Sequence, residues 1–306
     1  TEWALPTEKQ GHFRQLIQEQ QQRHDWYRTK QFMRAGFWRN FLVKYPEANE
    51  MYSRMLQVSR RVEELSSTVT DSAAVDLVAD ARRELYRAQC NCPYWHGAFG
   101  GLYLPHLRNA IYSKLITADT LLERASGHRG HWVDIQVDDY NLDARKEIRL
   151  SGDRLVGFLS PGNGGHLYEL DVRAIQINML ATLNRRPEPY HERIRQHSGQ
   201  GENSSGGGVD PNGGVCFKQP GLDQKLQYDN APRKSLVDHF FQPGLLHDTF
   251  CHGHGELGDF AEGVYQSKLR RSQERVEAGM WREGKLGPYS VKLSKFEMTS
   301  SVYLGT

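Results

Sequence analysis

The chain lacks a long apolar run, an excess of charge of one sign and paired cysteines. No stretch of about eighteen consecutive apolar residues occurs, and the mean hydropathy is -0.68, so the sequence excludes a transmembrane helix. The 306 residues carry a formal net charge of +2, with lysine and arginine dispersed along the chain. Nucleic-acid surfaces and polybasic membrane segments concentrate positive charge, so we expect no nucleic acid and no membrane as partners.

The four cysteines show no regular spacing. Cys90 and Cys92 lie too close together for the usual redox pair, and Cys216 and Cys251 stand far apart. Four-cysteine zinc sites normally show two Cys-x-x-Cys pairs, which are missing here. Free thiols fit a reducing compartment, so we expect a cytoplasmic protein without a metal or a cofactor.

We expect the chain to be truncated at both ends. The first residue is Thr1 instead of methionine, and Thr306 follows directly on a strand-like run. The absence of a signal peptide therefore has little weight.

Helical periodicity dominates the first part of the chain. A stripe of residues that is apolar except at Gln20 and His24 recurs at three- and four-residue steps over residues 7–33. Apolar stripes at the same spacing follow from Pro46, then after a cap at Asp71 or Ser72, and finally from Pro105. Four amphipathic helices with short connections predict an antiparallel helical bundle.

Beyond Ser126 the helical period disappears and short alternating segments follow. Glycine, asparagine, aspartate or proline bounds each of them, which is typical of an antiparallel β-sandwich. The expected strands lie around residues 132–137, 148–150, 155–158, 168–181, 264–276, 289–293 and 296–303. The predicted fold class is therefore α plus β in separate domains, with a helical bundle over residues 1–128 and a truncated β-sandwich over residues 129–306.

The most distinctive stretch, Cys90 to Arg108, combines aromatic rings with glycines. Its candidate binding residues are Tyr94, Trp95, His96 and Phe99. Glycines allow close backbone approach, while the rings offer a flat apolar face beside a hydrogen-bonding edge. Such a surface suits a sugar ring, which is apolar on its faces and hydroxylated at its rim. Burial of the aromatic residues in the helical core is the alternative.

Three other patterns have plainer explanations. Residues 279–285 match the glycine and lysine positions of a phosphate-binding loop, but Leu286 replaces the magnesium-binding Ser or Thr and Pro288 forbids the next helix. Glu169 and Asp171 share one face of a strand, which suits acid/base chemistry, although such pairs more often face solvent or anchor the fold. A solvated cluster, not a metal site, is favoured for His247, Asp248, Cys251, His252 and His254.

The stretch Cys90–Arg108 closely resembles the helical-domain signature of glycoside hydrolase family 57, the α-amylase and 4-α-glucanotransferase group. Three further stretches of the chain resemble this family in the same order. Glu2–Pro6 is similar to the segment that leaves its catalytic barrel, and Gly36–Phe41 with Lys44–Glu47 to the start of its helical region. Gly164–Asp171 and Arg185–His191 are similar to its C-terminal, galactose-mutarotase-like β-sandwich.

The resemblance implies an enzyme that acts on α-1,4-glucans with retention of configuration. In this family a glutamate nucleophile and an aspartate acid/base lie in an N-terminal barrel, which the chain lacks. The resemblance thus implies that the chain contains no catalytic residue, needs the barrel as its partner and is inactive alone. Its helical domain would supply one wall of the substrate cleft.

The sequence therefore predicts a fragment of a glycoside hydrolase or 4-α-glucanotransferase that contacts α-glucan or maltooligosaccharide through Tyr94, Trp95, His96 and Phe99. Hydrolysis and glucan transfer stay open, because water exclusion in the barrel decides between them. The alternative is a stand-alone, non-catalytic module for carbohydrate binding or scaffolding.

Overall fold

The chain forms two compact units, each built from segments far apart in the sequence. The computed structural model describes residues 2–96, 100–196, 221, 225–251, 253–272 and 275–301. One unit contains Thr1–Pro46 and Asn184–Asn230, and the other contains Glu47–Leu183 and Ala231–Thr306. The units do not divide at residue 128, because three long helices and both sheets belong to the second unit.

The described helices of the first unit are η1 (Glu2–Ala4), α1 (Thr7–Gln21), α2 (Trp26–Lys30), α3 (Trp38–Lys44) and α7 (Pro189–Gln196). The prediction of one helix over residues 7–33 is wrong, because the helix is interrupted between α1 and α2. From Gln18 to Asp25 the chain has no apolar side chain. A helical turn that packs no apolar face gains little from tertiary structure.

Glu188 joins the two segments of the first unit. Its carboxylate accepts hydrogen bonds from the Tyr45 hydroxyl at 2.5 Å and from Lys44 Nζ at 3.0 Å. Burial lowers the pKa of Lys44, against the opposing attraction of Glu188. The stretch 185–191, expected in the β-sandwich, thus lies with the start of the chain.

Three long helices belong to the second unit: α4 (Pro46–Thr68), α5 (Ser72–Ala88) and α6 (Pro105–Ala125). Their predicted starts are confirmed. Asp71 caps α5 by accepting a hydrogen bond from the Ala74 amide at 3.0 Å, and Pro105 occupies the first turn of α6. α5 packs along α6.

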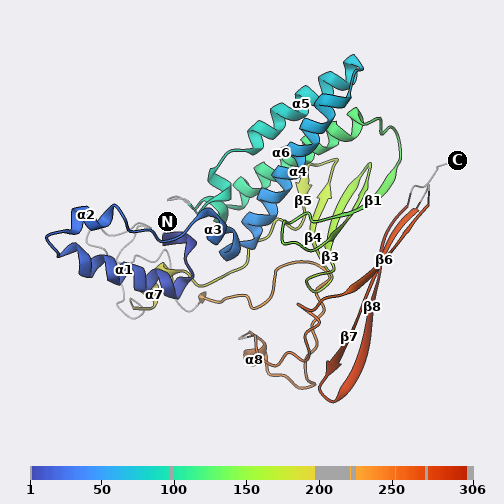
Figure 1. Ribbon diagram of the computed structural model, residues 1–306. Coiled ribbons are helices and arrows are strands. Elements are labelled where there is room, and N and C mark those ends of the chain that lie inside the picture. The colour runs from blue at the N-terminus through green and yellow to red at the C-terminus, as the bar shows by residue number, and fades with distance from the viewer. Residues whose placement is uncertain are drawn as a thin grey trace. The chain divides into compact units, whose positions relative to one another are not determined.

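Two antiparallel sheets complete the second unit (Figure 1). The five-stranded sheet follows chain order through β1 (Val133–Asp138), β2 (Glu147–Gly152), β3 (Leu155–Ser160), β4 (His166–Val172) and β5 (Ile177–Asn178). The three-stranded sheet contains β6 (Gln266–Arg271), β7 (Arg275–Leu286) and β8 (Tyr289–Ser301), and the short helix α8 (His247–Cys251) precedes it. Helices together with antiparallel sheets are therefore confirmed.

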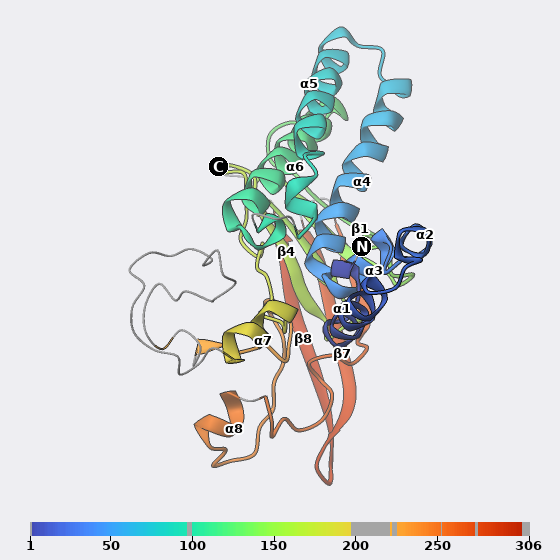
Figure 2. The same ribbon diagram turned by 90° about the vertical axis from the view of Figure 1, so that its left-hand side faces the viewer.

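The two faces of the five-stranded sheet are both covered, but by different chemistry. Apolar residues such as Ile148 and Leu150 share one core cluster with Val276 and Met280 of β7. The opposite face of β2 and β4 carries charged residues, yet these are also buried. Helices α4 and α6 lie beside this sheet (Figure 2). Strand alternation alone would place that polar face in water.

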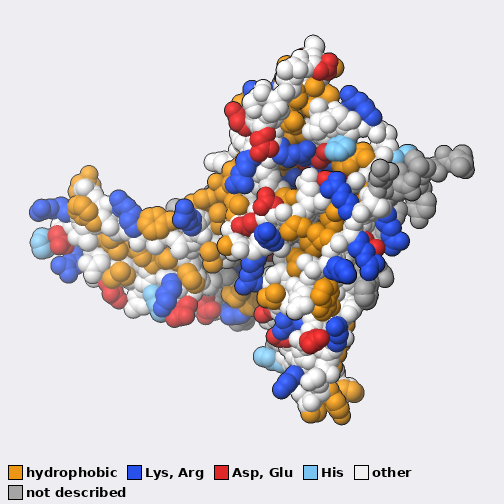
Figure 3. All heavy atoms as spheres, turned by 45° about the vertical axis from the view of Figure 1, so that its right-hand side comes forward, with side chains coloured by type: hydrophobic (Ala, Val, Ile, Leu, Met, Phe, Trp, Pro, Cys, Tyr) orange, Lys and Arg blue, Asp and Glu red, His pale blue; other side chains and the backbone are white. Residues whose placement is uncertain are grey.

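The surface drawn in Figure 3 mixes charges of both signs with apolar side chains. Lysine and arginine are interspersed with aspartate and glutamate on this face. Among the described helices, none combines the length and apolar character that crossing a bilayer requires.

Candidate functional site

The stretch Cys90–Arg108 connects α5 to α6 and folds back on itself. It contains two short 3-10 turns, η2 (Cys92–Tyr94) and η3 (Gly101–Tyr103), and its last four residues are the first turn of α6. The Leu102 amide donates to the Trp95 carbonyl at 2.8 Å. Gly101 has φ +40°, and a Cβ there would lie 2.1 Å from the Trp95 carbonyl oxygen. This glycine is therefore required by the stretch's own backbone.

Arg108 links the stretch to a distant segment of the same unit. Its guanidinium donates to the Leu102 carbonyl at 2.6 Å and to the Ala181 carbonyl at 3.2 Å. The loop between the two helices is thus tied to the segment that follows β5.

The predicted binding residues differ in exposure. Tyr94 is buried, and its hydroxyl donates to the Ala88 carbonyl at 2.8 Å. Burial raises the pKa of this phenol. His96 is also buried, edge-on to the Tyr103 ring at 5.2 Å between centroids. Trp95 is half-buried.

These positions give Tyr94 a structural part in the core, which was the alternative to sugar contact. Trp95 retains exposed surface for a ligand, and contact with a sugar stays a prediction. Phe99 lies outside the described residues. Cys90, Cys92 and Cys251 are free and exposed thiols, as expected, while Cys216 lies outside the described residues.

Glu169 and Asp171 do not face solvent. Both side chains are buried. Arg54 of α4 donates to Glu169 Oε1 at 2.9 Å and to Asp171 Oδ2 at 3.4 Å. The pair is therefore an anchor of the fold, and its burial leaves no access for a substrate.

The pair belongs to a larger charge cluster between helices and sheet. Asp119 of α6 lies at its centre, with Arg54, Arg149 and Arg173 at 3.5, 3.1 and 3.0 Å. Glu123, one helical turn later, accepts from Arg149 at 2.9 Å. The charge cluster comprises four arginines and four carboxylates: Arg54, Arg61, Arg149, Arg173, Asp119, Glu123, Glu169 and Asp171.

The carboxylates of the charge cluster have opposite electrostatic environments. Burial alone would raise the pKa of Asp119, but four arginines lower it well below its usual range. For Glu169, burial and the adjacent charge of Asp171 raise the pKa well above its usual range, and Arg54 offsets only part of this effect. The Asp119 side therefore favours the ionised state, and the Glu169 side favours the protonated state.

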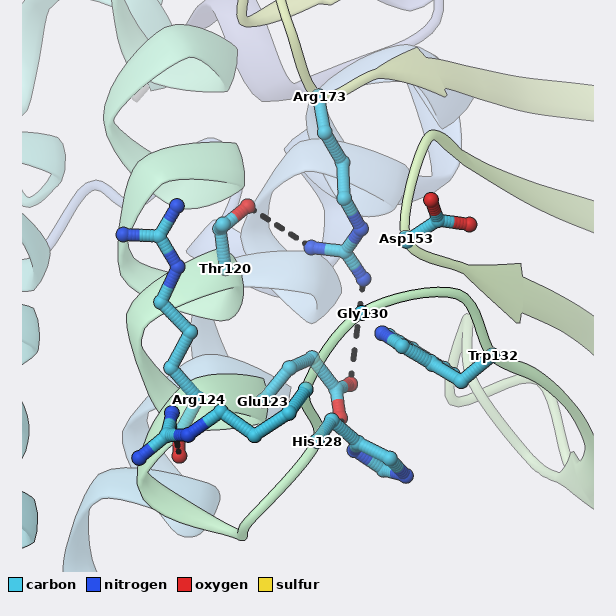
Figure 4. A pocket seen from close by; sticks show the side chains of 9 residues that line it. Thr120, Glu123, Arg124, His128, Gly130, Trp132, Asp153 and Arg173 are labelled. Carbon is cyan, nitrogen blue, oxygen red and sulfur yellow. Dashed lines mark hydrogen bonds and ion pairs between the residues drawn. The ribbon is translucent and has the colours of Figure 1, made fainter. Parts of the chain in front are cut away.

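A small cavity of about 240 Å³ lies at the edge of the charge cluster (Figure 4). Arg173 points into it, where Nη1 donates to the Thr120 hydroxyl at 2.9 Å. The Trp132 ring stacks on His128 with 4.1 Å between centroids. His128 Nδ1 in turn forms a hydrogen bond with Glu123 Oε2 at 2.9 Å. The side chains of five of the nine lining residues thus already pair with one another.

The phosphate-loop-like pattern and the histidine-rich cluster both have ordinary structural settings. Residues 279–285 lie inside β7, so they form no loop at a helix start. His247 and Cys251 adjoin on α8, with the sulfur 3.5 Å from the histidine Nε2, and both are exposed. His252 lies outside the described residues.

Sequence reasoning missed the helical half of the charge cluster. Arg54 and Arg61 lie two turns apart on α4, and Asp119 and Glu123 lie one turn apart on α6. Charged residues that repeat at helical spacing beside an apolar stripe were the available signal.

The chain is similar to known proteins over almost its whole length. Residues 36–122 match the family described as "Alpha-amylase/4-alpha-glucanotransferase, middle domain", and residues 139–302 match its C-terminal counterpart. An alpha-amylase of Pyrococcus abyssi is 34% identical over 96% of this chain and 41% of its own length. A 4-alpha-glucanotransferase of Thermococcus litoralis is 31% identical over 93% of this chain and 39% of its own length.

The fold agrees with these sequence matches. The crystal structure of 4-alpha-glucanotransferase from Thermococcus litoralis superposes with a TM-score of 0.72 at 28% identity, over 96% of this chain and 39% of that one. The chain thus spans about 40% of the length of these relatives. The matched family covers both the helices and the sheets, and the chain belongs to the alpha-amylase/4-alpha-glucanotransferase family.

Proposed function

We propose that the chain is the middle and C-terminal portion of an α-1,4-glucan-acting enzyme of glycoside hydrolase family 57. It would supply one wall of the substrate cleft, with Trp95 as the aromatic contact, and a catalytic barrel outside this chain would supply the nucleophile and the acid/base. The observation that carries the proposal is the pair of family matches over residues 36–122 and 139–302.

One observation supports the proposal that the catalytic residues lie in the barrel and not in this chain. The best carboxylate pair that the sequence offers, Glu169 and Asp171, is buried against Arg54. A general acid or base must reach the proton that it transfers, and this pair is closed to a glucan. The burial of this pair thus agrees with a proposal that assigns the catalytic carboxylates to the barrel.

The architecture in this proposal is a helical bundle with α4, α5 and α6 beside a galactose-mutarotase-like β-sandwich. The packing of α5 along α6 supports the bundle, and the core cluster shared by the two sheets supports the sandwich. The exposed free thiols of Cys90, Cys92 and Cys251 support a location in the cytoplasm.

The catalytic part of the proposal is tested with the purified chain and maltooligosaccharides. We expect no release of reducing sugar and no transfer of glucosyl units above a buffer blank. Turnover that follows the purified chain through a further column would contradict the absence of catalytic residues.

The binding part is tested by titrating amylose while tryptophan fluorescence is followed. We expect saturable quenching that Trp95→Ala abolishes, because a half-buried indole can stack on a glucose face. Trp132→Ala is the matched control, since this indole is stacked on His128, and it should retain the quenching. Saturable binding that survives Trp95→Ala would instead favour the stand-alone carbohydrate-binding or scaffolding module.

A further inference from the structure

The loop between β1 and β2 gathers oxygen ligands at regular spacing. Asp139, Asn141 and Asp143 alternate along the loop, and Glu147 begins β2. One oxygen from each of the three carboxylates lies within 4.8 Å of the others. Oxygens bound to one calcium ion at about 2.3–2.6 Å lie at most roughly 5 Å apart, so the observed spacing fits a shared cation.

Helix α4 holds the backbone of this loop in place. Asn49 Nδ2 donates to the Asn141 carbonyl at 2.7 Å, and the Ser53 hydroxyl donates to the same oxygen at 3.2 Å. Gln57 Nε2 donates to the Tyr140 carbonyl at 2.6 Å. These three donors are four residues apart and therefore lie along one face of α4. The loop is prearranged by the helix.

Glu147 provides an independent indication of a ligand. Its side chain has 0% exposure. Oε2 accepts hydrogen bonds from the Tyr140 and Asn141 amides at 2.9 and 3.2 Å, which turns the carboxylate toward the loop. Oε1 is buried and has no hydrogen-bond partner. A buried carboxylate oxygen without a partner is costly unless a cation or another donor satisfies it.

Backbone amides donate to Asp139 and Asp143, but no basic side chain pairs with the carboxylates of the loop among the described residues. Within the part of the chain that the structure describes, none of Asp139, Asp143 and Glu147 forms an ion pair with an arginine or lysine. Arg145, the nearest arginine in sequence, donates instead to the Gly162 carbonyl. The charge cluster differs in this respect, because each of its carboxylates contacts at least one arginine.

We propose that Asp139, Asn141, Asp143 and Glu147 form a calcium site that joins the β1–β2 loop to the start of β2. All four offer side-chain oxygens, which suit a hard divalent cation and not zinc or copper. Three negative charges and one amide match the ligand types of calcium loops. Calcium tolerates irregular coordination, whereas magnesium demands an octahedron, so the irregular loop favours calcium.

The proposal is tested by titrating calcium chloride into the chelator-treated full chain by calorimetry. We expect one saturable site and a saturable rise in Tm, because a ligand that binds the folded state stabilises it. Magnesium at the same concentration should bind at least about tenfold more weakly. Asp143→Asn, at an exposed position, should weaken calcium binding at least about tenfold, and Glu147→Gln should do the same.

Asp138→Asn is the matched control. Asp138 is an exposed carboxylate of the adjoining strand end and is not one of the three grouped carboxylates, so this variant should bind calcium like the unmodified chain. If Glu147→Gln fails to fold, the exposed Asp143→Asn decides alone. No saturable binding up to about 10 mM calcium, beyond even the weak extracellular class, overturns the proposal. Equal losses in Asp138→Asn and Asp143→Asn also overturn it.

Discussion

The stretch Cys90–Arg108 and the charge cluster are held together in different ways. The stretch is local: the Leu102 amide binds the Trp95 carbonyl, and Gly101 lies against carbonyl groups of its own loop. The charge cluster is distributed: its eight side chains come from two helices and two strands with the residue that follows β4. A local arrangement can be recognised from a run of consecutive residues, whereas an arrangement of residues far apart in the chain cannot.

The two regions also differ in what a single substitution removes. A change in the stretch alters backbone packing at one place. A change at Asp119 removes the shared partner of several buried arginines, and an uncompensated buried charge costs more than a displaced loop. This ranking is tested by comparing the free energy of unfolding of each variant with that of the unmodified chain.

The largest effect is expected for Asp119→Asn. The substitution keeps the side-chain shape but removes the negative charge that faces Arg54, Arg149 and Arg173. We expect a loss of about 3–5 kcal/mol, as for other broken buried ion pairs, measured by urea denaturation at pH 7. Asp80→Asn, at the exposed pair with Arg83, is the control and should cost under about 0.5 kcal/mol. Equal losses for the two variants would show that the charge cluster contributes no special stability.

A smaller loss is expected for Gly101→Ala. The new Cβ would overlap the Trp95 carbonyl oxygen, and the cost should be about 2–4 kcal/mol from overpacking and a positive φ. Gly130→Ala is matched, since its φ is +63° but a Cβ there would have no neighbouring atom within 4 Å, and about 1 kcal/mol is expected. If thermal denaturation gives both variants the same Tm, the close approach at Gly101 is not a constraint.

The smallest effect is expected for Glu169→Gln, at most about 1 kcal/mol at pH 7. Its carboxyl pKa is raised in the folded state, so this group favours folding below its unfolded pKa and loses that contribution as pH rises. The variant should therefore gain stability relative to the unmodified chain between pH 5 and pH 8.

Asp119 has the opposite sign, because its pKa is lowered on folding. Its contribution is present above the unfolded pKa and is lost as the pH falls toward the folded pKa. Urea denaturation curves of the Asp119→Asn and Glu169→Gln variants, measured at several pH values, compare how the stability contributed by each side of the charge cluster depends on pH. A Glu169→Gln variant that loses stability relative to the unmodified chain as pH rises would reverse the assignment of the protonated side.

Much of the fold could be predicted because it depends on local signals. Asp71 and Pro105 marked the starts of α5 and α6, and turn residues separated the strands of the first sheet. The break between α1 and α2 was missed, because glutamines at helical spacing resemble a stripe without supplying apolar packing. β7 was predicted only as far as residue 276, since Gly279 and Gly284 lie inside it and glycine is unfavourable in a strand interior.

The candidate site was predicted less completely. Trp95 was found because aromatic residues and glycines are concentrated around it, but the burial of Tyr94 depends on Ala88 and Tyr52 from the preceding helices. The alternating Asp139, Asn141 and Asp143 are adjacent in sequence, but they were not predicted as a site. Their significance depends on Glu147 and on the donors of α4, which no local spacing connects to them.

The sequence by itself determined the family, the presence of helices followed by antiparallel strands, and the aromatic stretch, because each depends on residues that are close together in the chain. Only the tertiary structure decided that the polar face of the first sheet is buried, that Glu169 and Asp171 pair with Arg54, and that Glu188 joins the first unit. A carboxylate has the same sequence signature whether water solvates it or a distant arginine pairs with it. Which of the two occurs depends on how the helices pack on the sheet.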